Sequence, residues 1–323
     1  GAARTAFAAR ARAALHNTVE HDREVAFDPA DGLYRGEQSF LDWREQSYPP
    51  WTANDTVHLG MSKSLSTNAA HHAALALLAD LEREAGDAAL ADRYAAWAED
   101  LARAIRARLW LPLDKQFATF IPTGLDSGPA RRFDALGTAL VVLTGIATPT
   151  AAAAAIASYP LLETGPPVLW PQQEAPPIYH NRAVWPFVTA YVLRAARAVG
   201  NDAVATVAAE SLLRGAAFNL SNLENFEMVA LAPYVAEGAT SGPVVNSPRQ
   251  LWSVAGFLAL VHEVVFGIET SSAGIRFLPF LPAALRERWL ADSDELVLDG
   301  FPYHEQRLIV RVILPPSDGE TAG

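Results

Sequence analysis

Residues 34–51 bring acidic, basic and aromatic side chains into one short segment. The charged groups and the rings are interleaved along it: Glu37, Asp42, Arg44 and Glu45 stand among Tyr34, Phe40, Trp43, Tyr48 and Trp51. Trp and Tyr rings stack on the flat C–H faces of a sugar, while carboxylates and guanidinium groups bind its hydroxyls. A carboxyl group beside Trp in a closed pocket has a raised pKa and can act as a general acid. The alternative is a solvated loop with an Asp helix cap and buried aromatic residues.

A second candidate segment, residues 179–186, reads Tyr-His-Asn-Arg-Ala-Val-Trp-Pro. Asn181 is a suitable cap for a following helix. Trp185 and Pro186 would then lie in its first turn, where Pro is tolerated. From that helix end His180 and Asn181 would project into a pocket. The alternative for His180 is a structural hydrogen bond to a neighbouring loop.

A third candidate segment carries three acids, Glu224, Glu227 and Glu237, ahead of a sequence that contains Trp252. Any of the three acids could serve as a general base. A surface pair on a short helical turn is the alternative for the first two, because they are three residues apart. The Asn-Phe pair between them favours a buried turn that faces the pocket.

Several other chemistries are not expected. No two His residues have a metal-binding spacing, and His71 and His72 are adjacent, so a catalytic metal or another cofactor is not expected. Ser62 and Ser253 lack the Gly-x-Ser-x-Gly setting of a hydrolase nucleophile. The chain has no Cys and no phosphate-binding glycine motif. Asp134 fits either an inward-facing carboxylate or the start of a helix.

Charge and hydropathy narrow the choice of partners. Lys and Arg number 25 against 36 Asp and Glu, a net charge of −11, and no basic block occurs. Nucleic acid is therefore not an expected partner. The uncharged stretch at 135–162 is interrupted by Gly145 and Pro149, which indicates two short buried helices rather than a membrane span. No signal peptide is visible. We expect a soluble protein, and the sequence leaves the compartment open, with a bacterial-type cytoplasm or periplasm as the alternatives.

Helical periodicity dominates the first 267 residues, and short breaks join many of the helices into antiparallel pairs. After Gly267 three strand-like runs predict a small C-terminal β appendage, which divides the chain into 1–267 and 268–323. Long polar loops separate the pairs, and loops of that length are usually functional or carry short strands. The expected helices span 3–21, 64–84, 88–109, 132–144, 150–158, 183–199, 202–215 and 248–266.

Two all-α architectures could arrange such hairpins. An α-solenoid would show a repeated consensus of fixed period, and the hairpins here differ in length and sequence. A closed ring, the (α/α)6 toroid, gathers the loops of one end around a central pocket. The aromatic and carboxylate-rich loops favour the toroid.

The three segments together resemble the six-hairpin, (α/α)6-barrel glycosidases. The likeness is closest to the clan that contains trehalase-like, glucosidase-like and debranching-enzyme C-terminal domains. It is carried by residues 36–43 (Gly-Glu-Gln-Ser-Phe-Leu-Asp-Trp), 179–187 (Tyr-His-Asn-Arg-Ala-Val-Trp-Pro-Phe) and 249–256 (Arg-Gln-Leu-Trp-Ser-Val-Ala-Gly). His-Asn-x-x-Val-Trp-Pro and Gln-x-Trp-Ser are its more specific parts.

This resemblance implies an exo-acting glycosidase, inverting or retaining, with two carboxylates across a central pocket. The general acid of such barrels lies in a mid-barrel loop and the base in the loop before the last helix, which matches the positions of Asp42 and of Glu224 and Glu227. We expect Asp42 to protonate the departing oxygen and Glu227 to activate water, with Glu224 and then Glu237 in reserve. Inversion is expected because relatives of this fold mostly invert. Trp43, Trp51, Trp185 and Trp252 would line the pocket, and Arg44, Glu45, His180 and Asn181 would hold the hydroxyls of an oligosaccharide or glycoside.

The chain departs from the family in helix number. A full ring needs twelve helices and about eight are expected here, so the first third of the barrel is expected to be absent or supplied by an N-terminal fragment or a partner chain. Three alternatives stay open: a sugar epimerase or a polysaccharide lyase on a similar toroid, moving protons with His or Tyr, and a carbohydrate-binding relative that has lost catalysis.

Overall fold

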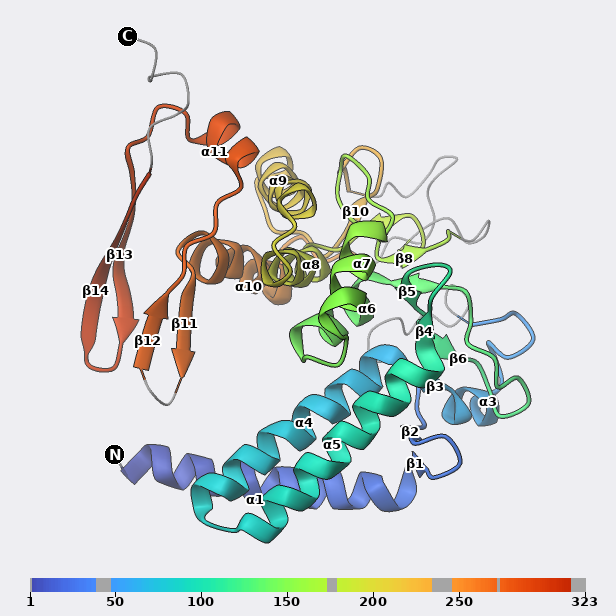
Figure 1. Cartoon of the computed structure of the whole chain (residues 1–323). Coiled ribbons are helices and arrows are strands. Elements are labelled where there is room, and N and C mark those ends of the chain that lie inside the picture. The colour runs from blue at the N-terminus through green and yellow to red at the C-terminus, as the bar shows by residue number, and fades with distance from the viewer. Residues whose placement is uncertain (1, 39–47, 173–178, 234–245, 272–273, 315–323) are drawn as a thin grey trace.

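The computed structural model describes residues 2–38, 48–172, 179–233, 246–271 and 274–314, and helices make up most of it (Figure 1). The last long helix, α10, continues directly into a π-helix, η1 (Leu260–Val265). The α-helices are α1 (Ala2–Val25), α3 (Thr56–Met61), α4 (Leu65–Ala85), α5 (Ala88–Leu109), α6 (Ala135–Leu143), α7 (Pro149–Ser158), α8 (Pro186–Ala198), α9 (Asp202–Asn219), α10 (Leu251–Ala259) and α11 (Ala283–Trp289).

The helices pair as hairpins at the breaks expected from the sequence. Gly86 ends α4 in the left-handed conformation (φ 87°), and Asp87 caps α5 by accepting a hydrogen bond from the backbone N–H of Leu90. Gly200, also left-handed, and the cap residue Asn201 make the same break between α8 and α9. The predicted pairs over 64–109 and 183–215 are therefore confirmed.

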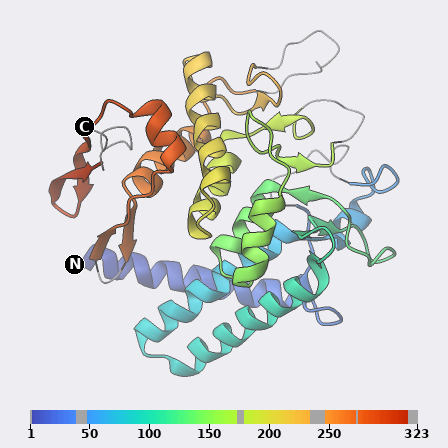
Figure 2. The same cartoon turned by 45° about the horizontal axis from the view of Figure 1, so that its top comes forward.

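Four helices form a consecutive row. α4 contacts α6, α6 contacts α8, and α8 contacts α10. Each of the first three also contacts the helix that follows it, α5, α7 or α9. α1 packs on α4, and in Figure 2 the blue α1 runs beside the cyan α4–α5 pair. The row buries two clusters, one around Trp185, Val188 and Leu212, the other around Leu75, Tyr94 and Ile105.

Short strand pairs of two residues each join the start of a row helix to the segment that follows its hairpin. β3 (Lys63–Ser64) pairs with β6 (Phe120–Ile121), β7 (Phe133–Asp134) with β8 (Leu169–Trp170), and β9 (Ala183–Val184) with β10 (Phe226–Glu227). In each pair, the first strand stands just before a row helix, and its partner follows the hairpin that this helix begins. We call these three pairs the rim. Two smaller pairs flank it, β1 (Phe27–Asp28) with β2 (Leu33–Tyr34) and β4 (Trp110–Leu111) with β5 (Gln116–Phe117).

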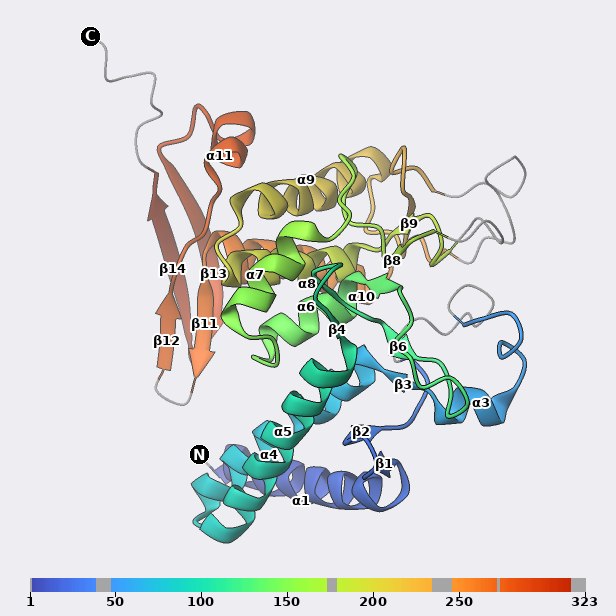
Figure 3. The same cartoon turned by 45° about the vertical axis from the view of Figure 1, so that its right-hand side comes forward.

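The C-terminal segment holds two antiparallel hairpins. β11 (Ile268–Ser271) pairs with β12 (Gly274–Phe277), and β13 (Glu295–Tyr303) with β14 (Gln306–Ile313), with α11 between them. β12, β13 and β14 confirm the three strands predicted after Gly267, whereas β11 and α11 were not predicted. These hairpins and the rim stand at opposite ends of the helical layer (Figures 1 and 3). Within the described ranges, no helix combines the length and apolarity needed to cross a bilayer.

Candidate functional site

Three rings from the segment before α8 form the centre of the candidate site. The ring centroids of Tyr179 and His180 lie 4.7 Å apart, those of Tyr179 and Trp185 4.9 Å apart, and those of His180 and Trp185 5.1 Å apart. All three side chains are buried. Trp185 directly precedes Pro186, the first residue of α8, so the start of a row helix fixes one side of this aromatic cluster.

Trp252, in the first turn of α10, extends the cluster to the surface. Its ring meets Trp185 edge-on at 5.8 Å and stacks on Phe187 at 4.6 Å. Trp252 is 40% exposed, so part of its ring is accessible to a ligand. The segments 179–187 and 249–256, which both resemble motifs of the (α/α)6-barrel glycosidases, are far apart in sequence but contact each other in the structure.

Glu224 joins the aromatic cluster through a hydrogen bond. The hydroxyl of Tyr179 donates to Glu224 Oε1 at 2.9 Å, and the backbone N–H of Ser247 donates to Oε2 at 2.8 Å. The backbone N–H of Glu224 in turn donates to the carbonyl of Ser247 at 2.9 Å. Glu224 is only 7% exposed, so its carboxylate is held in one orientation by two uncharged donors.

Glu227 lies three residues later but makes a different set of contacts. Its Oε2 accepts hydrogen bonds from the backbone N–H groups of Val229 and Ala230, both at 2.9 Å, which closes the turn that follows β10. Its Oε1 is buried and has no hydrogen-bond partner among the described residues. The idea of a surface pair on a helical turn is wrong, because residues 226–227 form a strand and Glu224 is buried.

His180 and Asn181 are both fully buried beneath the rim. Burial lowers the pKa of His180 to about 3, since the cationic form would lose its hydration. The capping role expected of Asn181 is wrong: β9 intervenes, and α8 begins at Pro186 with Trp185 in the cap position. The backbone is in the left-handed region at Tyr179 (φ 62°) and Arg182 (φ 60°). The sequence of residues 179–186 does not predict this conformation.

Asp134, the last residue of the rim strand β7, caps α6. It accepts hydrogen bonds from the backbone N–H of Gly137 and from the Thr119 hydroxyl, the latter at 2.6 Å. Burial raises the pKa of its carboxyl group. Thr119 also accepts a hydrogen bond from Gln38 Nε2 at 3.3 Å. Asp134 is therefore the start of a helix, and sequence reasoning missed its partners Thr119 and Gln38, which have no motif of their own.

Five predicted site residues lie outside the part of the chain that the structure describes: Asp42, Trp43, Arg44, Glu45 and Glu237. The described residues on either side of 39–47 contact each other, because the backbone N–H of Gln38 donates to the Tyr48 hydroxyl at 3.2 Å. That hydroxyl also lies 3.0 Å from Ser62 Oγ, just before β3. Gln38 and Tyr48 therefore both lie beside the rim.

Trp51 is not part of the described aromatic cluster. Trp51 precedes α3 and is 57% exposed. Its ring meets that of His58, a residue of α3, edge-on at 5.4 Å. Its role as a pocket-lining residue stays a prediction.

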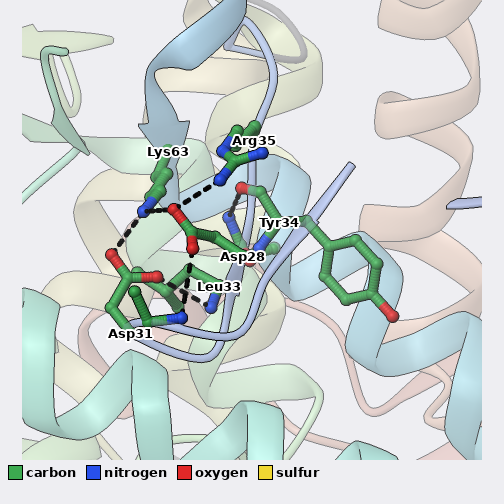
Figure 4. A network of polar contacts seen from close by, with 8 residues as sticks. Asp28, Asp31, Leu33, Tyr34, Arg35 and Lys63 are labelled. Atoms are coloured by element: carbon green, nitrogen blue, oxygen red, sulfur yellow. Dashed lines mark hydrogen bonds and ion pairs between the residues drawn. The ribbon is translucent and has the colours of Figure 1, made fainter. Parts of the chain in front are cut away.

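A charged network anchors the chain just before that segment (Figure 4). Lys63 Nζ donates to Asp28 at 2.7 Å and also to Asp31, and Arg35 pairs with Asp28 at 2.9 Å. The hydrogen bond from Lys63 is the main reason that the pKa of Asp28 falls to about 2. Gly36 N–H donates to the Ser62 carbonyl at 2.7 Å, so this network fixes residues 27–36 against β3. No group of three His, Asp or Glu side chains among the described residues is arranged to hold a metal ion.

Two solved structures share the fold. The GH78 family rhamnosidase of Bacillus sp. GL1 aligns with a TM-score of 0.57 and 20% identity, over 82% of this chain and 25% of that one. A sialidase structure aligns with a TM-score of 0.62 and 15% identity, over 93% and 27%. The chain spans about a quarter of the length of both, and identities this low show the fold alone.

The family match is more specific. No curated protein matches the chain. The model of the mannosylglycerate hydrolase MGH1-like glycoside hydrolase domain matches residues 10–227, well over half of the chain, and it confirms the resemblance to glycosidases seen in the sequence. The chain therefore belongs to the mannosylglycerate hydrolase MGH1-like glycoside hydrolase family.

Proposed function

We propose that the chain hydrolyses a terminal glycosidic bond of an oligosaccharide or glycoside, with Glu224 as the general base. One observation carries the choice of base: the Glu224 carboxylate is buried beside an aromatic cluster and oriented by Tyr179 and by the backbone of Ser247. Both donors are uncharged, so they orient the carboxylate without cancelling its charge. Family membership supports the reaction class.

Glu224 is a better candidate than Glu227 because of what each carboxylate already does. Glu227 Oε2 closes its own turn by accepting from two backbone N–H groups. Its Oε1 has no partner among the described residues, but none of the described hydrogen bonds joins Glu227 to the aromatic cluster, as Tyr179 joins Glu224. Glu224 oxygens each accept one of the described hydrogen bonds, and a carboxylate oxygen can accept two. A lone pair is then left for the attacking water.

Asp42 is the proposed general acid. In the proposed reaction it gives its proton to the glycosidic oxygen as the bond from that oxygen to the anomeric carbon breaks. Glu224 takes a proton from the water that attacks the opposite face of the sugar, which inverts the anomeric centre. Inversion calls for about 6.5–9.5 Å between the two carboxyl groups and retention for about 5–5.5 Å. Trp252 is the proposed stacking surface, and the buried Trp185 supports it from behind. Trp43, Arg44 and Glu45 are the proposed contacts to sugar. His180 and Asn181 are fully buried, so we propose that they support the site without touching the sugar.

The test uses a panel of aryl glycosides and single variants of the purified protein. Glu224→Gln and Asp42→Asn are each expected to lower kcat by about 10²–10⁴-fold, because each removes a positioned proton-transfer group. Glu227→Gln is the matched control and should keep most activity. Loss with Glu227→Gln and full activity with Glu224→Gln would reverse the assignment of the base. The configuration of the first-formed product, followed by NMR, decides between inversion and retention.

An epimerase or lyase would use a different set of groups. Such enzymes move protons with His or Tyr, and a histidine with a pKa of about 3 is a poor proton carrier near neutral pH. Release of reducing sugar distinguishes hydrolysis from epimerisation, and a new ultraviolet absorbance would indicate a lyase. Tight glycan binding without turnover would indicate the inactive carbohydrate-binding alternative.

We also propose that further helices complete an (α/α)6 ring against the row. α6, α8 and α10 border a hollow of about 440 Å³ whose lining includes Leu140, Phe187, Tyr191 and Trp252. Leu251, at the start of α10, is 81% exposed. A helical segment from the same polypeptide or from a partner chain would cover this apolar surface. Addition of such a segment should raise activity and protect α10 from hydrogen exchange.

A further inference from the structure

We infer that Tyr179 is a positioning residue for Glu224: its hydroxyl aims the carboxylate at the attacking water. The inference rests on the proposed function, since it assigns a role to the contact between Tyr179 and the proposed base. The chemistry acts through Glu224, while Tyr179 itself exchanges no proton with the substrate.

The position of the Tyr179 hydroxyl is determined by the surrounding contacts. The phenol ring meets Trp185 edge-on and lies 4.7 Å from the His180 ring, so it has little freedom to turn. Trp185 Nε1 also donates a hydrogen bond to the Tyr179 carbonyl at 3.4 Å. Trp185, the residue just before α8, thus holds both the ring and the backbone of Tyr179.

The backbone of Tyr179 is strained in the way that functional sites often are. Its φ of 62° places a bulky residue in the left-handed region, which costs free energy that the surrounding contacts must offset. A phenol that only filled space would not require this conformation. Here the conformation brings the hydroxyl within 2.9 Å of Glu224 Oε1.

The two hydrogen bonds have one consequence for the proposed base. Donors on both oxygens fix the plane of the carboxylate, and therefore the direction of its remaining lone pairs. Loss of the phenol hydroxyl should therefore let the carboxylate turn away from the attacking water and reduce turnover.

Tyr179→Phe tests the inference, and Tyr94→Phe is its matched control. Tyr94 is also buried and also donates to a glutamate, Glu20 Oε1 at 2.6 Å, but it lies between α1 and α5, away from the rim. For Tyr179→Phe we expect kcat to fall about tenfold with little change in KM, because a hydrogen bond to a charged group is lost. Tyr94→Phe should alter the unfolding temperature and leave kcat and KM unchanged.

The double variant separates positioning from a general structural effect. If Tyr179 acts through Glu224, Tyr179→Phe should cause no further loss in a Glu224→Gln background. The same tenfold loss in both backgrounds, or a wild-type kcat for Tyr179→Phe, would overturn the inference while the proposed function stands. Full activity of Glu224→Gln alone would instead overturn the proposed base.

Discussion

Two carboxylate environments in this molecule differ in what holds the charge. Asp28 and Asp31 lie against Lys63, and Arg35 adds a second cation to Asp28. Glu224 is held by a phenol hydroxyl and a backbone N–H, both neutral. A cation cancels the carboxylate charge and makes it a structural anchor, with a pKa of about 2 for Asp28. Neutral donors orient a carboxylate and leave its charge available for chemistry.

Removing one carboxylate charge from each region should have the largest and most different effects. Glu224→Gln should lower kcat by about 10²–10⁴-fold with a small change in stability. Asp28→Asn should lower the free energy of unfolding with a much smaller change in kcat, because it weakens the anchor of residues 27–36. Activity and chemical denaturation are measured on both variants. The reverse pattern, a catalytic effect at Asp28 and only a stability effect at Glu224, would contradict the distinction.

Removal of the shared cation should be the largest stability effect in the anchor. Lys63→Met leaves two partly buried carboxylates without their main partner, and we expect it to reduce the free energy of unfolding by about 3 kcal/mol. Arg83→Met is the control, since its ion pair with Asp80 is exposed and worth little. Urea denaturation gives both values, and equal losses would show that burial of the Lys63 network contributes nothing.

The aromatic cluster should make stability depend on pH in a window set by His180. With a folded-state pKa of about 3 and an ordinary value of 6.5, the unfolded chain binds a proton that the folded chain does not. Stability is therefore full above pH 6.5 and declines as the pH falls toward 3. His180→Gln should flatten this decline in pH-dependent thermal melts. An unchanged slope would show that His180 does not cause it.

The smallest expected effect is at the exposed edge of the cluster. Trp252→Ala should raise KM about 3–10-fold with little change in kcat, because it removes a stacking surface and no proton-transfer group. Kinetics on aryl glycosides measure this, and Trp51→Ala tests the exposed tryptophan outside the cluster in the same way. A loss confined to kcat would contradict a stacking role for Trp252.

Sequence patterns predicted the long helices well, because periodicity over many residues and breaks such as Gly86-Asp87 carry a strong local signal. The last helix begins at Leu251 rather than 248 and ends in a π-helix. The rim strands were not predictable, since two residues have no period. Because β9 was not predicted, the cap of α8 was placed at Asn181 instead of Trp185. The choice between Glu224 and Glu227 depends on hydrogen-bond donors such as Tyr179, 45 residues away, which spacing along the chain does not encode.

The rim pairs β3–β6, β7–β8 and β9–β10 act as staples, because each joins the strand before a helical hairpin to the strand after it. The connections from β6 to β7 and from β8 to β9 each begin and end in such a pair, so their interiors can be lengthened, shortened or rewritten without moving the helix that comes next. New substrate preferences can therefore arise by exchanging these connections one at a time. The scaffold beneath need not change with them.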